Sequence, residues 1–107
     1  MSENNICVRV FDENKEEFCI TEEEMIKAFA CCLKELRKYR KYTLKQVSDG
    51  TGIPFQTIAR YENGENVPSV IQAFKFSCFY KLELKDMLWA GYVSEDERER
   101  IFEEKLG

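Results

Sequence analysis

Basic side chains are concentrated in the middle of this 107-residue chain. Residues 26–60 carry eight Lys and Arg against two acidic side chains, a net charge of +6. Residues 1–25 carry −6 and residues 61–107 carry −4, which leaves the whole chain at −4. Clustered Lys and Arg attract phosphate groups, so the distribution of charge favours an anionic partner such as nucleic acid, although the chain as a whole is acidic.

Residue types that support covalent catalysis or metal binding are scarce. The chain has no histidine, which removes Ser-His and Cys-His catalysis and the HExxH zinc site. Its cysteines are odd in number and form no Cys-x-x-Cys, so we expect reduced, mostly buried thiols and not a disulfide framework or a zinc finger. They are Cys7, Cys19, Cys31, Cys32 and Cys78. The carboxylates are spaced as on helix surfaces, and we predict no catalytic residue, no metal site and no cofactor.

Length and composition bound the class of protein. A chain of 107 residues, 44% of them hydrophobic, suits one folded domain with an appendage. The longest apolar run is too short to cross a bilayer, and the polar N-terminus lacks the apolar core of a signal peptide. We therefore expect a cytoplasmic protein with no membrane partner.

The N-terminal residues alternate in polarity as strands do. In residues 6–11 the side chains of Ile6, Val8 and Val10 would share one face. Residues 12–16 read as a turn and residues 17–20 as a returning strand, which together predict a β-hairpin. Two strands are marginal alone, so the hairpin needs a partner surface. Both its own domain and a second copy of the chain remain open as that surface.

Six helices are predicted from caps and apolar spacing. Capping boxes at Thr21-Glu22-Glu23-Glu24 and Thr43-Leu44-Lys45-Gln46 begin the first two. Pro54 suits the first turn of the third, and Asn63-Gly64 suits its end. Ser69 caps the fourth. The expected helices are 21–39, 43–50 and 55–62, one beginning at Ser69, one at 85–90 ending at Gly91, and one beginning at Ser94.

Three finer expectations concern packing. The fourth helix should bury a stripe formed by Ile71, Phe74, Cys78 and Phe79. Gly50 should weaken the second helix by roughly 1 kcal/mol relative to alanine. The last helix is acidic and has few apolar residues, so we expect it to be solvated.

The second and third helices and their short turn form a candidate helix-turn-helix unit. Gly52 lies where the turn needs a positive φ, which glycine adopts without strain. Ser48 is small where the two helices would cross. Five residues should pack together in this unit: Val47, Thr51, Ile53, Ile58 and Tyr61.

The stretch TLKQVSDGTGIPFQTIARYENGENVPSV resembles the Cro and phage-repressor type of helix-turn-helix family, also called XRE-like. The residues that carry the resemblance are Thr43, Gly52-Ile53, Thr57-Ile58, the run Arg60 to Gly64, and Pro68-Ser69. The resemblance covers roughly residues 25–90. It implies a mainly α protein, with a five-helix lambda-repressor-like DNA-binding domain at 21–92. The β-hairpin extension at 1–20 and the acidic helix at 93–107 lie outside that domain.

In this family the second helix of the motif lies in the major groove of double-stranded DNA. The resemblance therefore implies base contacts from Phe55, Gln56, Ala59 and Arg60. Gln56 suits a paired contact with adenine, Arg60 suits guanine or a phosphate, and Phe55 suits a thymine methyl. Each of them could instead be a solvated helix position, and Phe55 could cap a core or an interface. The phosphate candidates are Thr43, Thr57, Asn63, Lys38, Arg40, Lys41 and Lys45.

Two functions compete on this sequence. The first is a sequence-specific transcriptional regulator, a homodimeric repressor whose hairpin is one candidate dimer element. The second is a protein-interaction module, or an antitoxin-like partner of another protein, that keeps the fold with weak DNA binding or none. The acidic ends of the chain favour the second function. So does Leu44, which stands where the family often has a phosphate-contacting glutamine.

Overall fold

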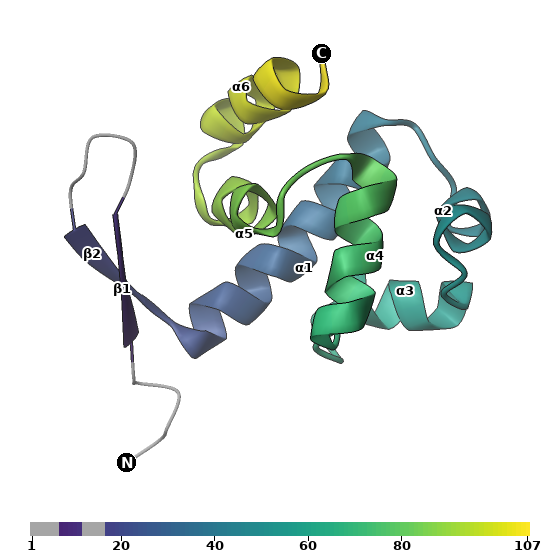
Figure 1. Cartoon of the computed structure of the whole chain (residues 1–107), viewed down its shortest axis with the longest axis horizontal. Coiled ribbons are helices and arrows are strands. Elements are labelled where there is room, and N and C mark those ends of the chain that lie inside the picture. The colour runs from purple at the N-terminus through teal and green to yellow at the C-terminus, as the bar shows by residue number, and fades with distance from the viewer. Residues whose placement is uncertain (1–6, 12–16) are drawn as a thin grey trace.

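The computed structural model describes residues 7–11 and 17–107, and within the two strands only the side chains from Cys19 onward (Figure 1). Ile6, the predicted turn at 12–16 and the facing of Val8 and Val10 lie outside this description. The elements are β1 (Cys7–Phe11), β2 (Glu17–Thr21), α1 (Glu22–Tyr39), α2 (Leu44–Thr51), α3 (Phe55–Glu62), α4 (Val70–Tyr80), α5 (Leu84–Tyr92) and α6 (Glu95–Leu106).

The predicted β-hairpin is present. β1 and β2 pair antiparallel, with Cys7 opposite Thr21 and Phe11 opposite Glu17. Ile20 is 2% exposed, so the end of β2 is buried within the chain itself. The hairpin lies beyond the N-terminal end of α1, on the opposite side of the molecule from α2 and α3 (Figure 1).

Both predicted capping boxes are confirmed. The Thr21 hydroxyl accepts from the Glu24 amide at 3.1 Å, and the Glu24 carboxylate accepts from the Thr21 amide at 2.9 Å. Thr43 and Gln46 make the same pair of bonds at 3.1 and 2.8 Å. Each pair satisfies two amides that a helix start would leave without partners, and so fixes where α1 and α2 begin.

The hydrophobic core surrounds α1, against which α5 makes the most extensive contact. Leu33 and Leu36 on α1, Met87 on α5 and Phe76 on α4 are all at most 1% exposed. Val47, Ile53 and Ile58 join the same core, so the helix-turn-helix unit is held by the body of the domain.

The predicted end of the fifth helix is wrong, because α5 continues through Gly91 to Tyr92. A Cβ atom at Gly91 would overlap the carbonyl oxygen of Ala28 on α1. Glycine is therefore present here to let two helix backbones approach closely, and it does not end the helix. The spacing of residues in the sequence does not distinguish a glycine that ends a helix from one that allows close packing of two helices.

Gly50 lowers the helix propensity of α2, but it also makes room for a side chain of α4. The ring of Phe79, on α4, occupies the space that a Cβ atom at Gly50 would take. Phe79 also stacks obliquely on Tyr42, with ring centroids 5.5 Å apart. The lost helix propensity of Gly50 is thus offset by packing between α2 and α4.

The predicted buried stripe of α4 is also wrong except at Phe79, which is partly buried against the core. Ile71 and Phe74 are 64% and 59% exposed, and Cys78 is exposed. The buried face carries Phe76 and Tyr80 instead. Since α4 is apolar on almost every side, its sequence does not indicate which face meets the core.

The acidic helix α6 is docked and not simply solvated. Phe102 is 2% exposed and packs on Tyr39, with ring centroids 5.3 Å apart. Arg98 donates to the carbonyl oxygens of Ala90 at 2.8 Å and Val93 at 3.3 Å. These bonds satisfy carbonyl groups near the C-terminal end of α5, where the helix has no partners of its own.

Lys81 follows α4 in the left-handed conformation, with φ 59° and ψ 44°. That conformation costs a non-glycine residue about 1–2 kcal/mol. We expect Lys81→Gly to raise the free energy of unfolding by about 1 kcal/mol, measured by urea denaturation. Lys81→Ala removes the same charge and keeps the strain, so it should give no gain. An equal gain in both variants would show that the charge, not the backbone, sets the effect.

Candidate nucleic-acid interface

The turn between α2 and α3 is fixed by its own hydrogen bonds. Gly52 has φ 77°, as predicted, and its amide donates to Ser48 at 2.8 Å. The Ser48 hydroxyl donates to the carbonyl of Ile53 at 2.6 Å. The Thr51 hydroxyl donates to Val47 at 2.8 Å and accepts from the Ile53 amide at 3.2 Å. The polar residues of the turn therefore hold the angle between the two helices.

The predicted packing of the unit is confirmed at its apolar residues. Val47, Ile53, Ile58 and Tyr61 are between 0% and 7% exposed. Tyr61 meets Phe76 edge-on, with ring centroids 6.0 Å apart. Tyr61 is therefore a core residue, which leaves the other side of α3 to face solvent.

The C-terminal end of α3 is closed as predicted at Asn63-Gly64. Gly64 has φ 75°, and its amide donates to Tyr61 at 3.1 Å. The Glu65 amide donates to Arg60 at 2.9 Å. This pair of bonds is a Schellman motif, which satisfies carbonyls at the helix end. Pro54 is the N-cap and not the first helical residue, and it makes no side-chain cap.

The predicted base-contact residues lie on the outer side of α3. Phe55 is 49% exposed, Gln56 and Arg60 are exposed, and Ala59 is half-buried. Within the described part of the chain, the side chains of Gln56 and Arg60 make no hydrogen bond or ion pair. Their amide and guanidinium groups are therefore available to an external partner.

The strands do not cover this side of α3 (Figure 1). The hairpin lies at the far end of α1, and the α1–α2 connection, α2 and α3 lie along one side of the molecule (Figure 1). The nearest acidic group in α3 itself, Glu62, is turned inward to Arg37. The exposed face of α3 is thus covered neither by the strands (Figure 1) nor by the Glu62 carboxylate.

Arg37, one of the eight basic residues of the middle segment, is turned inward to an acidic partner. The Arg37 Nε donates to Glu62 Oε2 at 2.8 Å, and Nη2 donates to Glu62 Oε1 at 3.0 Å. Nη1 donates to the Tyr42 carbonyl at 3.2 Å. The Arg37 side chain is 20% exposed and that of Glu62 is 5% exposed. We call this pair the α1–α3 clamp, because it joins the two helices.

The clamp also affects the pKa of Arg37. The hydrogen bond to Glu62 raises the pKa of Arg37 above its ordinary value, despite the opposing effect of burial. Arg37 therefore remains charged throughout the neutral pH range. Arg37 and Glu62 are 25 positions apart in the sequence. No local pattern pairs residues at that separation, so the sequence alone could not have predicted the clamp.

The predicted phosphate-contact residues differ in their exposure and in whether their side chains already have a partner within the chain. Lys41 is exposed, and Arg40 is half-buried. Lys45 lies 3.3 Å from Asp49 and Lys38 lies 3.7 Å from Glu35, but these pairs are largely solvated and therefore weak. The Thr43 oxygen already accepts from Gln46. Of the other two candidates, Asn63 is exposed and Thr57 is half-buried.

The buried thiol of α1 is not reactive. Burial, reinforced by the neighbouring Cys31, raises the pKa of Cys32 well above its ordinary range, so the thiol stays protonated. Among residues 7–11 and 17–107, no three acidic or cysteine side chains are grouped as metal ligands. No helix in the same ranges has the length and apolar composition needed to cross a membrane.

Comparison with known proteins agrees with the geometry of the turn. The model of the Helix-turn-helix family matches residues 33–87, about half of the chain, from within α1 to within α5. The chain is also similar to YgzD of Bacillus subtilis (strain 168), described as an uncharacterized HTH-type transcriptional regulator. The two are 32% identical over 57 residues, which is 53% of this chain and 86% of YgzD. No solved structure matches the chain. The chain belongs to the Cro and phage-repressor type of helix-turn-helix family.

Proposed function

We propose that this protein is a sequence-specific DNA-binding regulator of transcription that acts in the cytoplasm as a dimeric repressor. The observation that carries the proposal is the exposed side of α3, where Gln56 and Arg60 have no partner among the described residues. Family membership and the similarity to YgzD, a protein named as a transcriptional regulator, support it.

In the proposed complex, the N-terminal part of α3 enters the major groove. The amide of Gln56 pairs with the N6 and N7 groups of an adenine, and Arg60 binds guanine or the adjacent phosphate. Phe55 offers an apolar surface to a thymine methyl, beside the small side chain of Ala59. The first amides of α3 have no side-chain cap, and they are available to a phosphate oxygen.

Phosphate contacts would come from the start of α2 and the turn before it. Lys38, Arg40, Lys41 and Lys45 supply the charge that holds a duplex irrespective of sequence. Thr43, Thr57 and Asn63 add hydrogen bonds that fix the register. Two copies on a two-fold operator would set their α3 helices about 34 Å apart, one turn of the duplex.

The second candidate is an antitoxin-like or other protein-interaction module, and the position of Leu44 favours it. Leu44 is half-buried against the core, so it supplies no polar group at the start of α2. The two candidates differ in one measurement. A regulator binds selected genomic DNA fragments at low salt with an affinity that falls steeply as salt rises, whereas the module does not bind them.

Gln56→Ala should weaken binding to the selected operator roughly 10–100-fold, which corresponds to about 1–3 kcal/mol, and relax the preference at one base pair.

Lys41→Ala should instead weaken binding to all sequences and reduce the slope of log affinity against log salt by about 1. Gel shifts at two salt concentrations measure both effects.

Lys27→Ala is the matched control for Lys41→Ala. Lys27 is a well-solvated cation near the start of α1, at the hairpin end of the molecule, and its loss should leave the salt slope unchanged. Equal effects of the two lysine substitutions would argue against the proposed orientation on DNA. Unchanged sequence preference in Gln56→Ala would argue against α3 as the reading helix.

A further inference from the structure

The solvent-exposed side of α4 carries several large apolar side chains. Val70, Ile71 and Phe74 are 72%, 64% and 59% exposed, and Cys78 is exposed one turn further on. Their spacing places them along one side of the helix. We call these four residues the α4 stripe. Three of them, Ile71, Phe74 and Cys78, were predicted from the sequence to be buried.

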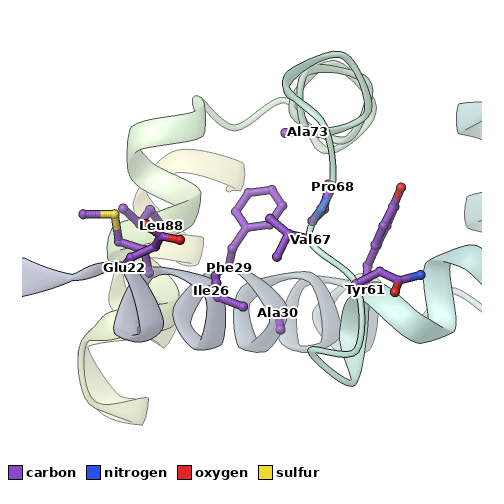
Figure 2. A pocket seen from close by; sticks show the side chains of 11 residues that line it. Glu22, Ile26, Phe29, Ala30, Tyr61, Val67, Pro68, Ala73 and Leu88 are labelled. Atoms are coloured by element: carbon purple, nitrogen blue, oxygen red, sulfur yellow. The ribbon is translucent and has the colours of Figure 1, made fainter. Parts of the chain in front are cut away.

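α4 also contributes to an apolar groove. It has a volume of about 480 Å³ and lies between the first half of α1, the loop before α4, and α5 (Figure 2). Phe29 and Val67 point into it, with Ala73 of α4 and Leu88 of α5 at its sides. Val67 is 61% exposed. α4 thus contributes Ala73 to the groove and the four residues of the stripe to the solvent-exposed surface.

We propose that the α4 stripe is the two-fold contact through which two copies of this chain pair. The inference rests on the proposed function for its purpose, since an operator with two half-sites needs two copies. It names a surface that differs from the hairpin. A two-fold contact is self-complementary, so each copy buries its own stripe against the same stripe of the other.

The area suits a second copy. Full burial of a large apolar side chain removes roughly 60–120 Å² from water, so Val67 and the stripe offer on the order of 300 Å² per copy. Two copies would bury about 600 Å² of apolar surface, which is half of the roughly 1,200 Å² in the smallest stable interfaces. Interfaces as a whole are a little over half apolar, so polar rim residues would supply the rest.

The charge distribution also selects a second copy over a partner of opposite charge. Between residues 66 and 80 the one charged side chain is Lys75, in a chain that is 34% charged. A strongly acidic or basic partner would find no complementary group here, and DNA would find a single cation. Two copies of a chain with net charge −4 repel each other least where neither carries carboxylates.

The position of the stripe is compatible with DNA reading. α4 follows α3 through the short connection after Gly64, while Gln56 lies at the other end of α3. The proposed pairing requires that a contact through α4 leave the N-terminal part of α3 uncovered in both copies. The connection between the helices is fixed at its start by the Schellman motif, so pairing through α4 would also fix the separation of the two α3 helices.

Sedimentation equilibrium of the full chain without DNA tests this proposal. We expect the wild-type chain to dimerise, and Phe74→Glu and Ile71→Glu each to raise the dimer dissociation constant at least ~100-fold, because each would bury an unpaired carboxylate. Both residues are mostly exposed in the single copy, so the circular dichroism and urea midpoint of the monomer should be unchanged.

Phe55→Glu is the matched control, because it makes the same substitution at another exposed phenylalanine. It should leave dimerisation intact and weaken DNA binding. A wild-type chain that remains monomeric at about 100 μM, or a dimer that survives both α4 substitutions, would overturn the proposal. A chain that dimerises through α4 but binds no DNA would sink the proposed function alone.

Discussion

Gly91→Ala should lower the free energy of unfolding by about 3 kcal/mol or more, one of the two largest effects expected of a single substitution in this protein. The added methyl group would overlap the carbonyl oxygen of Ala28, which belongs to the backbone of α1. Relief requires α1 and α5 to separate, and these two helices form the largest contact in the core. Urea denaturation measures the loss.

Gly50→Ala is the control for that substitution. Its methyl group would meet the ring of Phe79, and a side chain can rotate away where a backbone cannot. Alanine also gains about 1 kcal/mol of helix propensity over glycine at either position. We expect a change within about 1 kcal/mol for Gly50→Ala. Equal losses in the two variants would show that close helix approach is not what Gly91 provides.

Arg37→Ala should cost about 3 kcal/mol, because it leaves the 5%-exposed carboxylate of Glu62 without its partner. Arg37→Lys keeps the charge but not the forked pair of hydrogen bonds, so it should recover part of the loss. Since the pKa of Arg37 is raised, the stability that it contributes is present below the ordinary arginine pKa and is lost only above the raised value. The difference from wild type should therefore persist up to alkaline pH.

Arg37→Ala also tests the link between the clamp and DNA. Glu62 is the last residue of α3, so loss of the clamp should weaken operator binding even where the variant remains folded. Affinity measured at a temperature well below the unfolding midpoint separates the two effects. Full operator affinity in a destabilised Arg37→Ala would show that the clamp serves stability alone.

The parts of the fold that depend on neighbours in sequence were predictable. Caps at Thr21 and Thr43 and the left-handed glycines at 52 and 64 are local signals, because the hydrogen bonds they make lie within a few residues. These signals were enough to place α1 to α3 and to identify the family. The side of α3 that faces outward followed from the same pattern.

The errors all lie in contacts between distant segments. Nothing in the sequence near Gly91 indicates that Ala28 lies against it, and nothing near Arg37 indicates Glu62. The buried side of α4 was misjudged because apolar residues occupy almost every side of that helix. The structure gives the position and exposure of each candidate DNA-contact residue. Their contacts with bases and phosphates remain predictions.

The two ends of α3 are held unequally. Its final residue is tied to α1 by two charged hydrogen bonds and closed by the turn at Gly64, whereas Pro54 gives its first residues no side-chain cap. We therefore expect this helix to fray first at its N-terminal turn. In the proposed complex with DNA, the first turn of α3 would therefore adjust to grooves of slightly different width, while the clamp keeps the angle of α3 to the rest of the molecule constant.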